Sequence, residues 1–493
     1  MTHEEILTTL GHYVDYLIAG STAEAPLWNI EKVRSGKPNK WNYIDGCMIT
    51  ACLSLYKTTG DEKFLDFSKK FLDYFVKDNG VIETYDPAEY NLDNVNQGKN
   101  LFTLYDLTGN QRYRDAIETI RGQLETQPRT KEGNFWHKKI YPNQVWLDGT
   151  YMAQPFYMEY ETRCNGMHGC IDSYKQFMNI QKHMKDAKTG LYYHGYDESR
   201  EMYWANPETG CSANFWLRAM GWFLVAMVDT LERMDNQLYY EYRAIMAMLK
   251  DAVDAMIAFQ DAESGMFWQV VDKAGIEGNY LETSGSALFA YAVLKGERLG
   301  YLPKRYTAYG EKAFYGTCDR HLGVGADGAL QLGGICLVAG LGGATRRDGS
   351  LADILPAAEA LGVTVAVEPV TYHSMNSAAA TRHILDTMRS PNLKVIFDMS
   401  NLVDAGNVGA QDRIWNDVGE LLGDQIVAVH FKGQAFAPDG GLLHTSLEDS
   451  LTDYAGAFAM LRQLPQDALP VLREEAVPAR AASDIAFMRG FFA

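Results

Sequence analysis

The acidic residue Asp148 lies in aromatic surroundings that would suit a proton donor. It sits between Trp146 and Tyr151 within residues 143–157, where a loop gives way to an expected helix, and Gly149 lets the backbone pass close to the acid. Because low-dielectric walls raise the pKa of a carboxyl group, Asp148 could donate a proton near neutral pH. The alternative is a helix N-cap followed by buried aromatic residues, since Asp is a favoured cap. Both interpretations can hold at once.

Further polar and aromatic residues lie in other expected helices or in the loops before them: Asp93, His194, Trp216, Arg218 and, one helical turn beyond Arg218, Trp222. Two carboxylates on different helical hairpins suit acid and base catalysis on a sugar. Aromatic rings suit stacking on sugars, and an Arg with a His suits a substrate carboxylate, which Arg can grip with two N–H groups. Taken singly, the His is more often structural and the Trp residues could be core. Their occurrence together on corresponding loops favours a site.

A separate group of metal-binding residue types lies near the C-terminus: Glu368, Asp398, His430 and Glu474. Each stands at or just past the end of a short β-branched run. Three carboxylates and one imidazole at successive strand ends form a hard site suited to Mn²⁺, Mg²⁺, Co²⁺ or Zn²⁺. Glu475 competes with Glu474 for the last position. The alternative is that these acids merely cap the helices that follow the strands.

The first group must be positioned by helices. Residues 1–320 show apolar residues at helical spacing in eleven segments: 4–19, 42–58, 62–77, 94–107, 111–126, 149–161, 170–185, 212–233, 238–259, 283–299 and 305–319. LYKTTGDEKF (residues 55–64) matches LYDLTGNQRY (104–113), and in each copy a Thr-Gly helix end precedes an Asp or Asn that starts the next helix. Such a repeat predicts stacked helical hairpins. Closed into a ring they form a double-layered barrel; an open solenoid is the alternative.

The chain changes character after about residue 345. Helical stretches then alternate with the β-branched runs 363–367, 393–397, 426–430 and 469–472. This alternation predicts parallel βαβ units. Four strands are half of what a closed eightfold barrel needs, so two sheet edges and an open apolar face are expected.

Composition narrows the function classes. A chain of 493 residues predicts two or more domains. The net charge of −18 argues against nucleic acid or an anionic membrane as partner. Seven Cys without paired CxxC spacing suggest free thiols in a reducing cytoplasm. The N-terminus does not resemble a signal peptide, and no stretch is long and apolar enough for a membrane span.

Residues 1–350 resemble glycoside hydrolase family 105, the unsaturated rhamnogalacturonyl hydrolases. The motifs are WNYIDG (41–46), QVWLDGTYM (144–152), GLYYHGY (190–196), WLRAMGW (216–222) and GGICLVAGLGG (333–343). The resemblance implies an (α/α)6 barrel that removes a 4,5-unsaturated uronic acid from a pectin fragment by hydration, without a metal. It also implies that Asp148 is the general acid/base and Asp93 the second acid. His194, Trp216 and Arg218 would line the uronate pocket.

VAVEP (365–369), IFDMSN (396–401), VHFKGQ (429–434) and LREE (472–475) resemble the second half of a xylose-isomerase-like sugar phosphate isomerase/epimerase barrel. This implies a divalent metal on the four ligands above. The two resemblances meet near residue 350, which predicts a helical (α/α)6-type domain without its last helix over 1–350 and a half TIM barrel over 351–493. The helix 351–361 could stand in as the twelfth helix of the ring. Function should follow the more complete hydrolase part; the alternatives are a metal-dependent sugar epimerase or isomerase, a non-catalytic sugar binder, or a non-catalytic fusion product.

Overall fold

The computed structural model describes residues 3–276, 278–325, 330–341, 351–371, 375–437, 441–466, 468–474 and 480–491. The chain divides into two compact units, Met1–Thr345 and Arg346–Ala493. The predicted boundary at residue 350 lies outside the described residues. Each unit is considered separately below.

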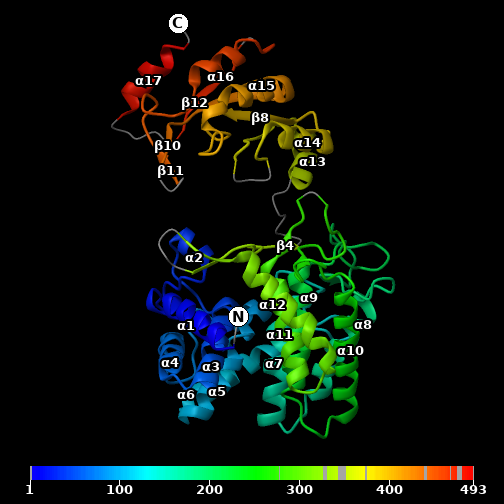
Figure 1. The fold of residues 1–493 in the computed structure, drawn as a ribbon. Coiled ribbons are helices and arrows are strands. Elements are labelled where there is room, and N and C mark those ends of the chain that lie inside the picture. Colours follow the sequence, from blue (N-terminus) through cyan, green and yellow to red (C-terminus); the bar gives the residue numbers. More distant parts are fainter. Residues whose placement is uncertain are drawn as a thin grey trace. The chain divides into compact units, whose positions relative to one another are not determined.

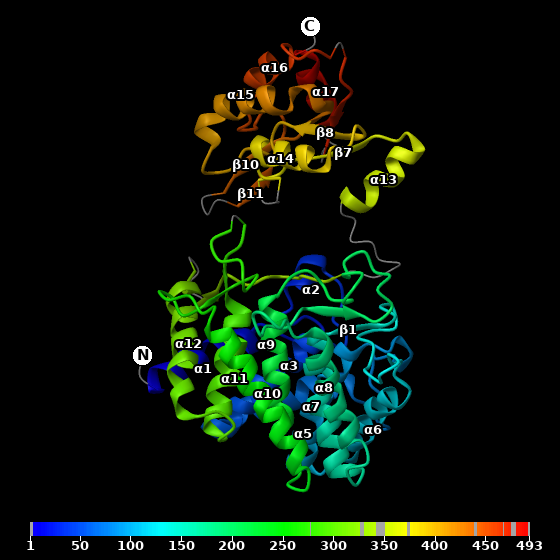
Figure 2. The same ribbon diagram turned by 90° about the vertical axis from the view of Figure 1, so that its right-hand side faces the viewer.

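The first unit is built from antiparallel helical hairpins (Figures 1 and 2). The inner helix and the outer helix of each hairpin are α3 (Tyr43–Thr59) with α4 (Glu62–Phe75), α5 (Gly98–Thr108) with α6 (Gln111–Thr126), α7 (Leu147–Cys164) with α8 (Cys170–Met184), α9 (Leu217–Leu231) with α10 (Tyr239–Ile257), and α11 (Thr283–Arg298) with α12 (Thr307–His321). Before them come α1 (His3–Ala19) and the short α2 (Ile30–Ser35), and short 3₁₀ turns fill the loops: η1 (Pro87–Glu89), η2 (Leu92–Val95) and η3 (Lys304–Tyr306). All eleven expected helices are present, and α2 is an addition.

The repeated turn has the geometry that its residues predict. Gly60 and Gly109 end α3 and α5 in the left-handed region, with φ of 73° and 64°. The next residues, Asp61 and Asn110, cap α4 and α6 by accepting a hydrogen bond from a backbone N–H two residues on. A residue without Cβ at the turn and a short acceptor after it make each hairpin tight.

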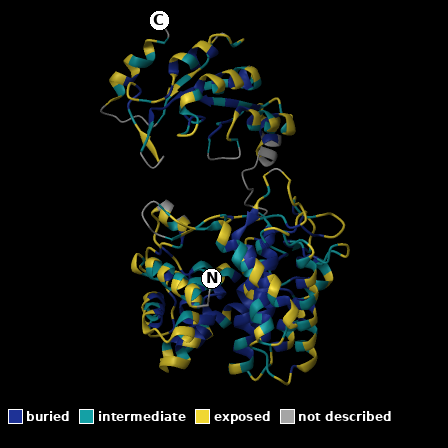
Figure 3. Cartoon of the chain, in the orientation of Figure 1, coloured by how far each residue is buried: buried dark blue, intermediate teal, exposed yellow. Residues whose placement is uncertain are grey.

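The inner helices pack in succession, α3 on α5, α5 on α7, α7 on α9 and α9 on α11. Every residue of α9 except Arg218 is buried, as expected of a helix enclosed on all sides (Figure 3). Among the described residues no helix of this unit follows α12. Helix α1 has Val14 as its one described buried side chain, against Cys52 of α3 and Phe64 of α4. The helical barrel without its last helix is confirmed.

The helix α13 (Leu351–Leu361) does not complete this ring as a twelfth helix. Its Leu355 is buried in the core of the second unit together with Val395 and Trp415. Its apolar face is therefore used by the half barrel, and the expectation that α13 stands in for the missing helix is wrong.

The loops before inner helices form two short antiparallel pairs: β1 (Gln144–Trp146) with β2 (Gly195–Asp197), and β3 (Phe267–Trp268) with β4 (Leu281–Glu282). A third pair, β5 (Leu322–Val324) with β6 (Leu330–Leu332), follows α12. The β1–β2 pair joins the start of α7 to the loop that precedes α9. It therefore brings two of the motif loops together.

The second unit contains a four-stranded parallel sheet in the order β12-β9-β8-β7. Its strands are β7 (Val365–Val367), β8 (Leu393–Asp398), β9 (Ile426–Phe431) and β12 (Val471–Arg473), with a hairpin of β10 (Gln434–Phe436) and β11 (Leu442–His444). Its other elements are α14 (Ala378–Met388), α15 (Gln411–Leu422), α16 (Tyr454–Leu461), α17 (Ala481–Arg489), η4 (Val408–Ala410) and η5 (Gly423–Gln425). Apolar residues of α14, α15 and α16 pack on the face of the sheet that carries Val395 and Phe397. The predicted half of a parallel barrel is confirmed.

None of the helices that the structure describes combines the length and apolar character needed to cross a bilayer. All seven cysteine thiols are free.

Candidate active site

The centre of the candidate site is a pair of side chains, Asp148 and His194. Asp148 is the second residue of α7, and His194 directly precedes β2. The pairing of Trp146 with Gly195 in the β1–β2 register brings the two loops together, and His194 Nε2 lies 3.1 Å from Asp148 Oδ2. The Asp148 side chain is 14% exposed and that of His194 5%. A carboxyl group near the mouth of the ring therefore faces an imidazole in a largely water-free setting.

The pKa of Asp148 differs from the expectation. Burial raises it, as predicted, but the charge of His194 and its hydrogen bond lower it, and the pKa ends below its ordinary value. The N-terminus of a helix also favours a carboxylate. The N-cap is Trp146, which makes no side-chain capping hydrogen bond, whereas Asp148 lies within the first turn of the helix. Both the raised pKa and the cap role are thus wrong for this protein without substrate.

The second carboxylate, Asp93, is held by two basic side chains. It lies in η2, before α5, and Lys138 Nζ is 2.6 Å from its Oδ2 while His137 Nε2 is 3.5 Å from its Oδ1. Burial lowers the pKa of Lys138, but Asp93 raises it above its ordinary value. Burial lowers the pKa of His137 to about 4, so this imidazole is neutral near pH 7. Asp93 is therefore paired with one cation and one neutral ring.

Aromatic rings surround these groups. Trp146 stacks on His137 with ring centroids 4.7 Å apart and meets the edge of His194 at 5.4 Å. Trp216 lies 4.7 Å from the His194 ring. Trp222 stacks on Tyr151 with ring centroids 4.8 Å apart. The three Trp residues thus form flat apolar walls, which suit the apolar face of a sugar ring.

Tyr43 connects this wall to the acids. It stands at the start of α3, its ring meets Trp222 edge-on at 6.4 Å, and burial and then the charge of Asp93 raise the pKa of its hydroxyl, with smaller effects of Arg218 and Asp148. The Tyr43 hydroxyl is therefore within electrostatic range of all three charged groups. It remains protonated at neutral pH and can donate a hydrogen bond.

Arg218 holds part of the chain that crosses the mouth. We call residues 333–341 the mouth strap. The Arg218 guanidinium lies 4.6 Å from the Trp216 ring and donates to the carbonyl oxygens of Cys336 and Leu337, the latter at 3.3 Å. At its other end the Leu341 carbonyl accepts a hydrogen bond from the Tyr203 hydroxyl. Arg218 therefore fixes the strap in this structure, a role that the sequence did not suggest.

The structure brings together all seven residues expected at this site: Asp93, Trp146, Asp148, His194, Trp216, Arg218 and Trp222. Sequence reasoning missed Tyr43, His137 and Lys138. Tyr43 lies within the WNYIDG motif, and the other two lie in the long loop 133–148, so both segments carried a signal.

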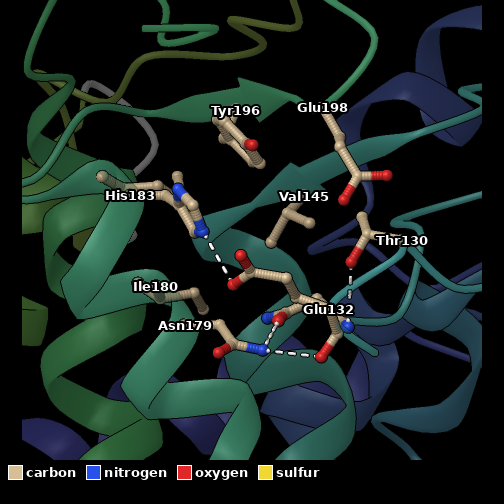
Figure 4. Close-up of a pocket in the computed structure, with 10 residues that line it drawn as sticks. Thr130, Glu132, Val145, Asn179, Ile180, His183, Tyr196 and Glu198 are labelled. Carbon is tan, nitrogen blue, oxygen red and sulfur yellow. Dashed lines mark hydrogen bonds and ion pairs between the residues drawn. The ribbon is translucent and has the colours of Figure 1, made fainter.

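A small hollow of about 10 Å³ lies between the 130–134 loop, α8 and the β1–β2 pair, lined in part by Val145 and Tyr196. Figure 4 shows His183 reaching Glu132, and the two side chains form an ion pair at 2.9 Å. The His183 ring also stacks on Tyr196. None of the expected site residues lines this hollow, so it is separate from the Asp148 centre.

In the second unit the four expected metal ligands converge. Glu368, Asp398, His430 and Glu474 each offer one ligand atom, and these atoms lie within 4.8 Å of one another. His430 Nδ1 lies 3.4 Å from Glu368 Oε2 and 3.3 Å from Glu474 Oε1. Burial raises the pKa of Asp398 to about 7, and nearby Glu368 adds to this. Acids crowded around one imidazole fit a divalent cation, which would relieve their repulsion. Glu475 lies outside the described residues.

Comparison with known proteins settles the family of the first unit. Residues 23–352, more than half of the chain, match the family described as Glycosyl Hydrolase Family 88. The chain belongs to glycosyl hydrolase family 88. This family 88 protein is thus a glycoside hydrolase, as predicted, and its ring holds the Asp148 centre.

Individual relatives support the same family assignment. A solved structure of a family 105 glycoside hydrolase from C. acetobutylicum is 40% identical, covers 69% of this chain and 92% of its own, and superposes with a TM-score of 0.62. Protein Atu3128 of Agrobacterium fabrum is 38% identical over 206 residues, which are 40% of this chain and 86% of the relative. The unsaturated rhamnogalacturonyl hydrolase YesR of Bacillus subtilis is 26% identical over 285 residues, 57% of this chain and 76% of YesR. The resemblance to family 105 is confirmed.

Residues 345–490 match a second family, described as Xylose isomerase-like TIM barrel. The two matched ranges overlap by only a few residues. The family 88 protein therefore carries a partial isomerase-like barrel C-terminal to its helical ring in the sequence, as the two sets of motifs predicted.

Proposed function

We propose that this protein removes a 4,5-unsaturated uronic acid from the non-reducing end of rhamnogalacturonan fragments left by a pectin lyase. The observation that carries the proposal is the Asp148–His194 pair, a carboxyl group and an imidazole 3.1 Å apart between the walls formed by Trp146 and Trp216. A carboxyl so placed can deliver a proton to a sugar ring stacked on the aromatic walls.

The chemistry is hydration of an enol ether. Asp148 gives its proton to C4, and positive charge develops at C5 and the ring oxygen. Water adds at C5 while the Asp148 carboxylate takes one of its protons. The resulting hemiketal opens as its C5–O5 bond breaks, which leaves a ketone at C5 and a hemiacetal at C1. The hemiacetal then releases the partner sugar as an alcohol and becomes an aldehyde, so the product is a saturated open-chain keto acid. Because one residue gives and then takes the proton, the spacing of two carboxylates in ordinary glycosidases does not apply.

The other side chains bind and orient. His194 stands beside the Asp148 carboxyl group. When the His194 ring moves away from Asp148, it can donate a hydrogen bond to the carboxylate of the uronate. Arg218 lies next to Trp216 and adds positive charge on that side. Asp93, held by Lys138 and His137, can accept hydrogen bonds from sugar hydroxyls, and Trp222 stacked on Tyr151 offers a further flat apolar surface. These contributions are of the kind that position a substrate for reaction.

The choice of substrate rests on relatives and on charge. The B. subtilis relative named above carries the name unsaturated rhamnogalacturonyl hydrolase. The net charge of −18 disfavours nucleic acid and anionic lipid as partners, so an acidic oligosaccharide must be bound by local cations such as Arg218 and Lys138. Seven free thiols favour a reducing compartment, and we place the enzyme in the cytoplasm.

The substrate can be tested by absorbance, because a 4,5-unsaturated uronide absorbs in the near ultraviolet and hydration removes the band. The full chain should bleach an unsaturated rhamnogalacturonan disaccharide faster than an unsaturated glucuronyl disaccharide. Bleaching of neither would contradict the proposed reaction, while faster bleaching of the glucuronyl compound would contradict only the substrate.

The converging ligands of the second unit favour a second candidate, a metal-dependent sugar epimerase or isomerase within about residues 351–493. A divalent ion bound to Glu368, Asp398, His430 and Glu474 would polarise a carbonyl sugar. Interconversion of ketoses that is lost on removal of the metal would support it. Absence of bound metal after dialysis would contradict it.

A further inference from the structure

A narrow cavity lies directly behind the turn that carries Asp148. It measures about 10 Å³ and is lined by buried residues of α7, of the loop before β1 and of α8, among them His137, Gly149, Thr150, Gln154 and Gln176. This volume is about what one water molecule needs. The cavity adjoins the hollow in Figure 4, since Asn134, Val145 and Ile180 line both, and Thr150 is two residues after Asp148.

Two polar atoms of this cavity lack a partner in the part of the chain that the structure describes. They are Nδ1 of His137 and Oγ1 of Thr150, on side chains that are 3% and 4% exposed. The other polar side chains nearby are used: Gln154 accepts a hydrogen bond from Ser173, and Gln176 accepts one from the backbone of Phe135. Leaving a buried nitrogen and a buried hydroxyl without partners costs free energy, so a bridging group is expected.

The glycine at position 149 makes room for this arrangement. A Cβ on Gly149 would lie 2.8 Å from His137 Nδ1. The imidazole therefore packs against the backbone of the Asp148 turn with its Nδ1 edge. Its Nε2 edge points the other way, to Asp93 Oδ1 at 3.5 Å.

We infer that the cavity holds one ordered water molecule that bridges Thr150 Oγ1 and His137 Nδ1 and thereby fixes His137 in the tautomer with its proton on Nε2. A neutral imidazole has one donor and one acceptor, and the partner of one nitrogen decides which it is. The water donates to Nδ1 and accepts from Thr150, so Nε2 carries the proton and donates to Asp93. Thr150 and His137 are positioning residues for Asp93, and this last consequence rests on the proposed function.

The water itself is tested by crystallography of the full chain at a resolution that shows ordered solvent. Density within hydrogen-bond distance of both atoms is expected in the wild type and in Thr150→Ser, which keeps the hydroxyl. It should be lost in Thr150→Val, which has the same shape without the donor. The inference would be overturned if the wild type showed well-ordered Thr150 and His137 side chains but no water density between them. It would also be overturned if the water density persisted in Thr150→Val. Neither result depends on turnover.

The tautomer gives a second readout. In protein labelled with ¹⁵N-histidine, the His137 signals are identified by their loss in His137→Gln. Nδ1 should resonate as an unprotonated nitrogen in the wild type and in Thr150→Ser, whereas Thr150→Val should show a mixture. A proton found on Nδ1 in the wild type would overturn the assignment.

The positioning role is read from kinetics on the unsaturated disaccharide. Thr150→Val should lower kcat on the order of tenfold with little change in KM, the size typical of a lost orienting partner, and Thr150→Ser should restore it. Equal kcat in the two variants would refute the positioning role. If the wild type bleaches no unsaturated uronide, the proposed function fails, and the water and tautomer are still decided by density and ¹⁵N shifts.

Discussion

His194 Nε2 lies 3.1 Å from Asp148 Oδ2, and this contact reverses the effect of burial on the carboxyl. Burial alone would raise the pKa of Asp148, but the imidazole lowers it below the ordinary value. Asp148, the proposed proton donor, is therefore ionised near neutral pH in the free enzyme. A substrate carboxylate that draws His194 away would let the pKa rise at the moment when the proton is needed.

The first prediction follows from the sign of this effect. For a general acid, kcat/KM falls as pH rises above its pKa in the free enzyme. Replacing His194 by Gln keeps a donor but removes the charge that favours the carboxylate, while burial still raises the pKa of Asp148. We therefore expect the falling limb of the pH profile of His194→Gln to move to higher pH.

The matched control is His183→Gln, because His183 also pairs with a carboxylate, Glu132 at 2.9 Å, but does so away from the site. Its profile should follow that of the wild type. A limb that stays in place or moves to lower pH in His194→Gln would show that the imidazole does not set the pKa of Asp148.

The second prediction concerns Asp148 itself. Asp148→Asn keeps the size of the side chain but removes the proton that is given to C4. The loss should be about 10²–10⁴-fold in kcat, the range of general acid–base catalysis. Asp78→Asn is the control, because the Asp78 side chain is fully exposed. Bleaching of the unsaturated disaccharide at a near wild-type rate by Asp148→Asn would remove Asp148 as the acid.

Most of the helical ring could be predicted because its signals are local. Apolar spacing marked the helices, and Thr-Gly followed by Asp or Asn marked the tight turns that Gly60 and Gly109 form. The end of the first unit was harder to predict from the sequence, since α13 has an apolar face that would fit either the ring or the half barrel. Only the burial of Leu355 among residues of the second unit decides the matter.

The site was predictable where motifs placed charged and aromatic residues at helix starts, as for Asp148 and Arg218. The hydrogen bonds from Arg218 to the mouth strap could not be predicted, because they are accepted by backbone carbonyl oxygens, which every residue has. The direction of the pKa shift of Asp148 was missed for a related reason. Sequence indicates apolar walls, but it does not tell which cation stands at hydrogen-bond distance.

The third prediction tests the anchoring of the mouth strap. The planar guanidinium of Arg218 reaches the carbonyls of Cys336 and Leu337 together, which a single ammonium group does less well. In Arg218→Lys we expect faster amide hydrogen exchange over residues 333–341. A lost hydrogen bond to a charged group is worth about 1.5–3 kcal/mol, so kcat/KM should fall by about tenfold or more.

Arg305→Lys is the control for this variant, because Arg305 also lies over an aromatic ring, that of Tyr306, and its guanidinium donates a hydrogen bond to the Tyr306 hydroxyl. Its exchange pattern over 333–341 should match the wild type. Unchanged exchange in Arg218→Lys would mean that the strap is held by its other contacts, such as that of Cys336 N–H with Glu282.

The fourth prediction concerns the metal ligands of the second unit. The full chain, loaded with Mn²⁺ and dialysed, should retain about one ion, which Glu368→Gln should lose because the amide removes one anionic ligand. Glu420→Gln, an exposed acid on α15, should retain it. At free metal about 100 times the dissociation constant, binding should stabilise the second unit by about 2.7 kcal/mol. Equal metal content in Glu368→Gln and Glu420→Gln, measured by elemental analysis, would show that the four converging side chains are not a metal site.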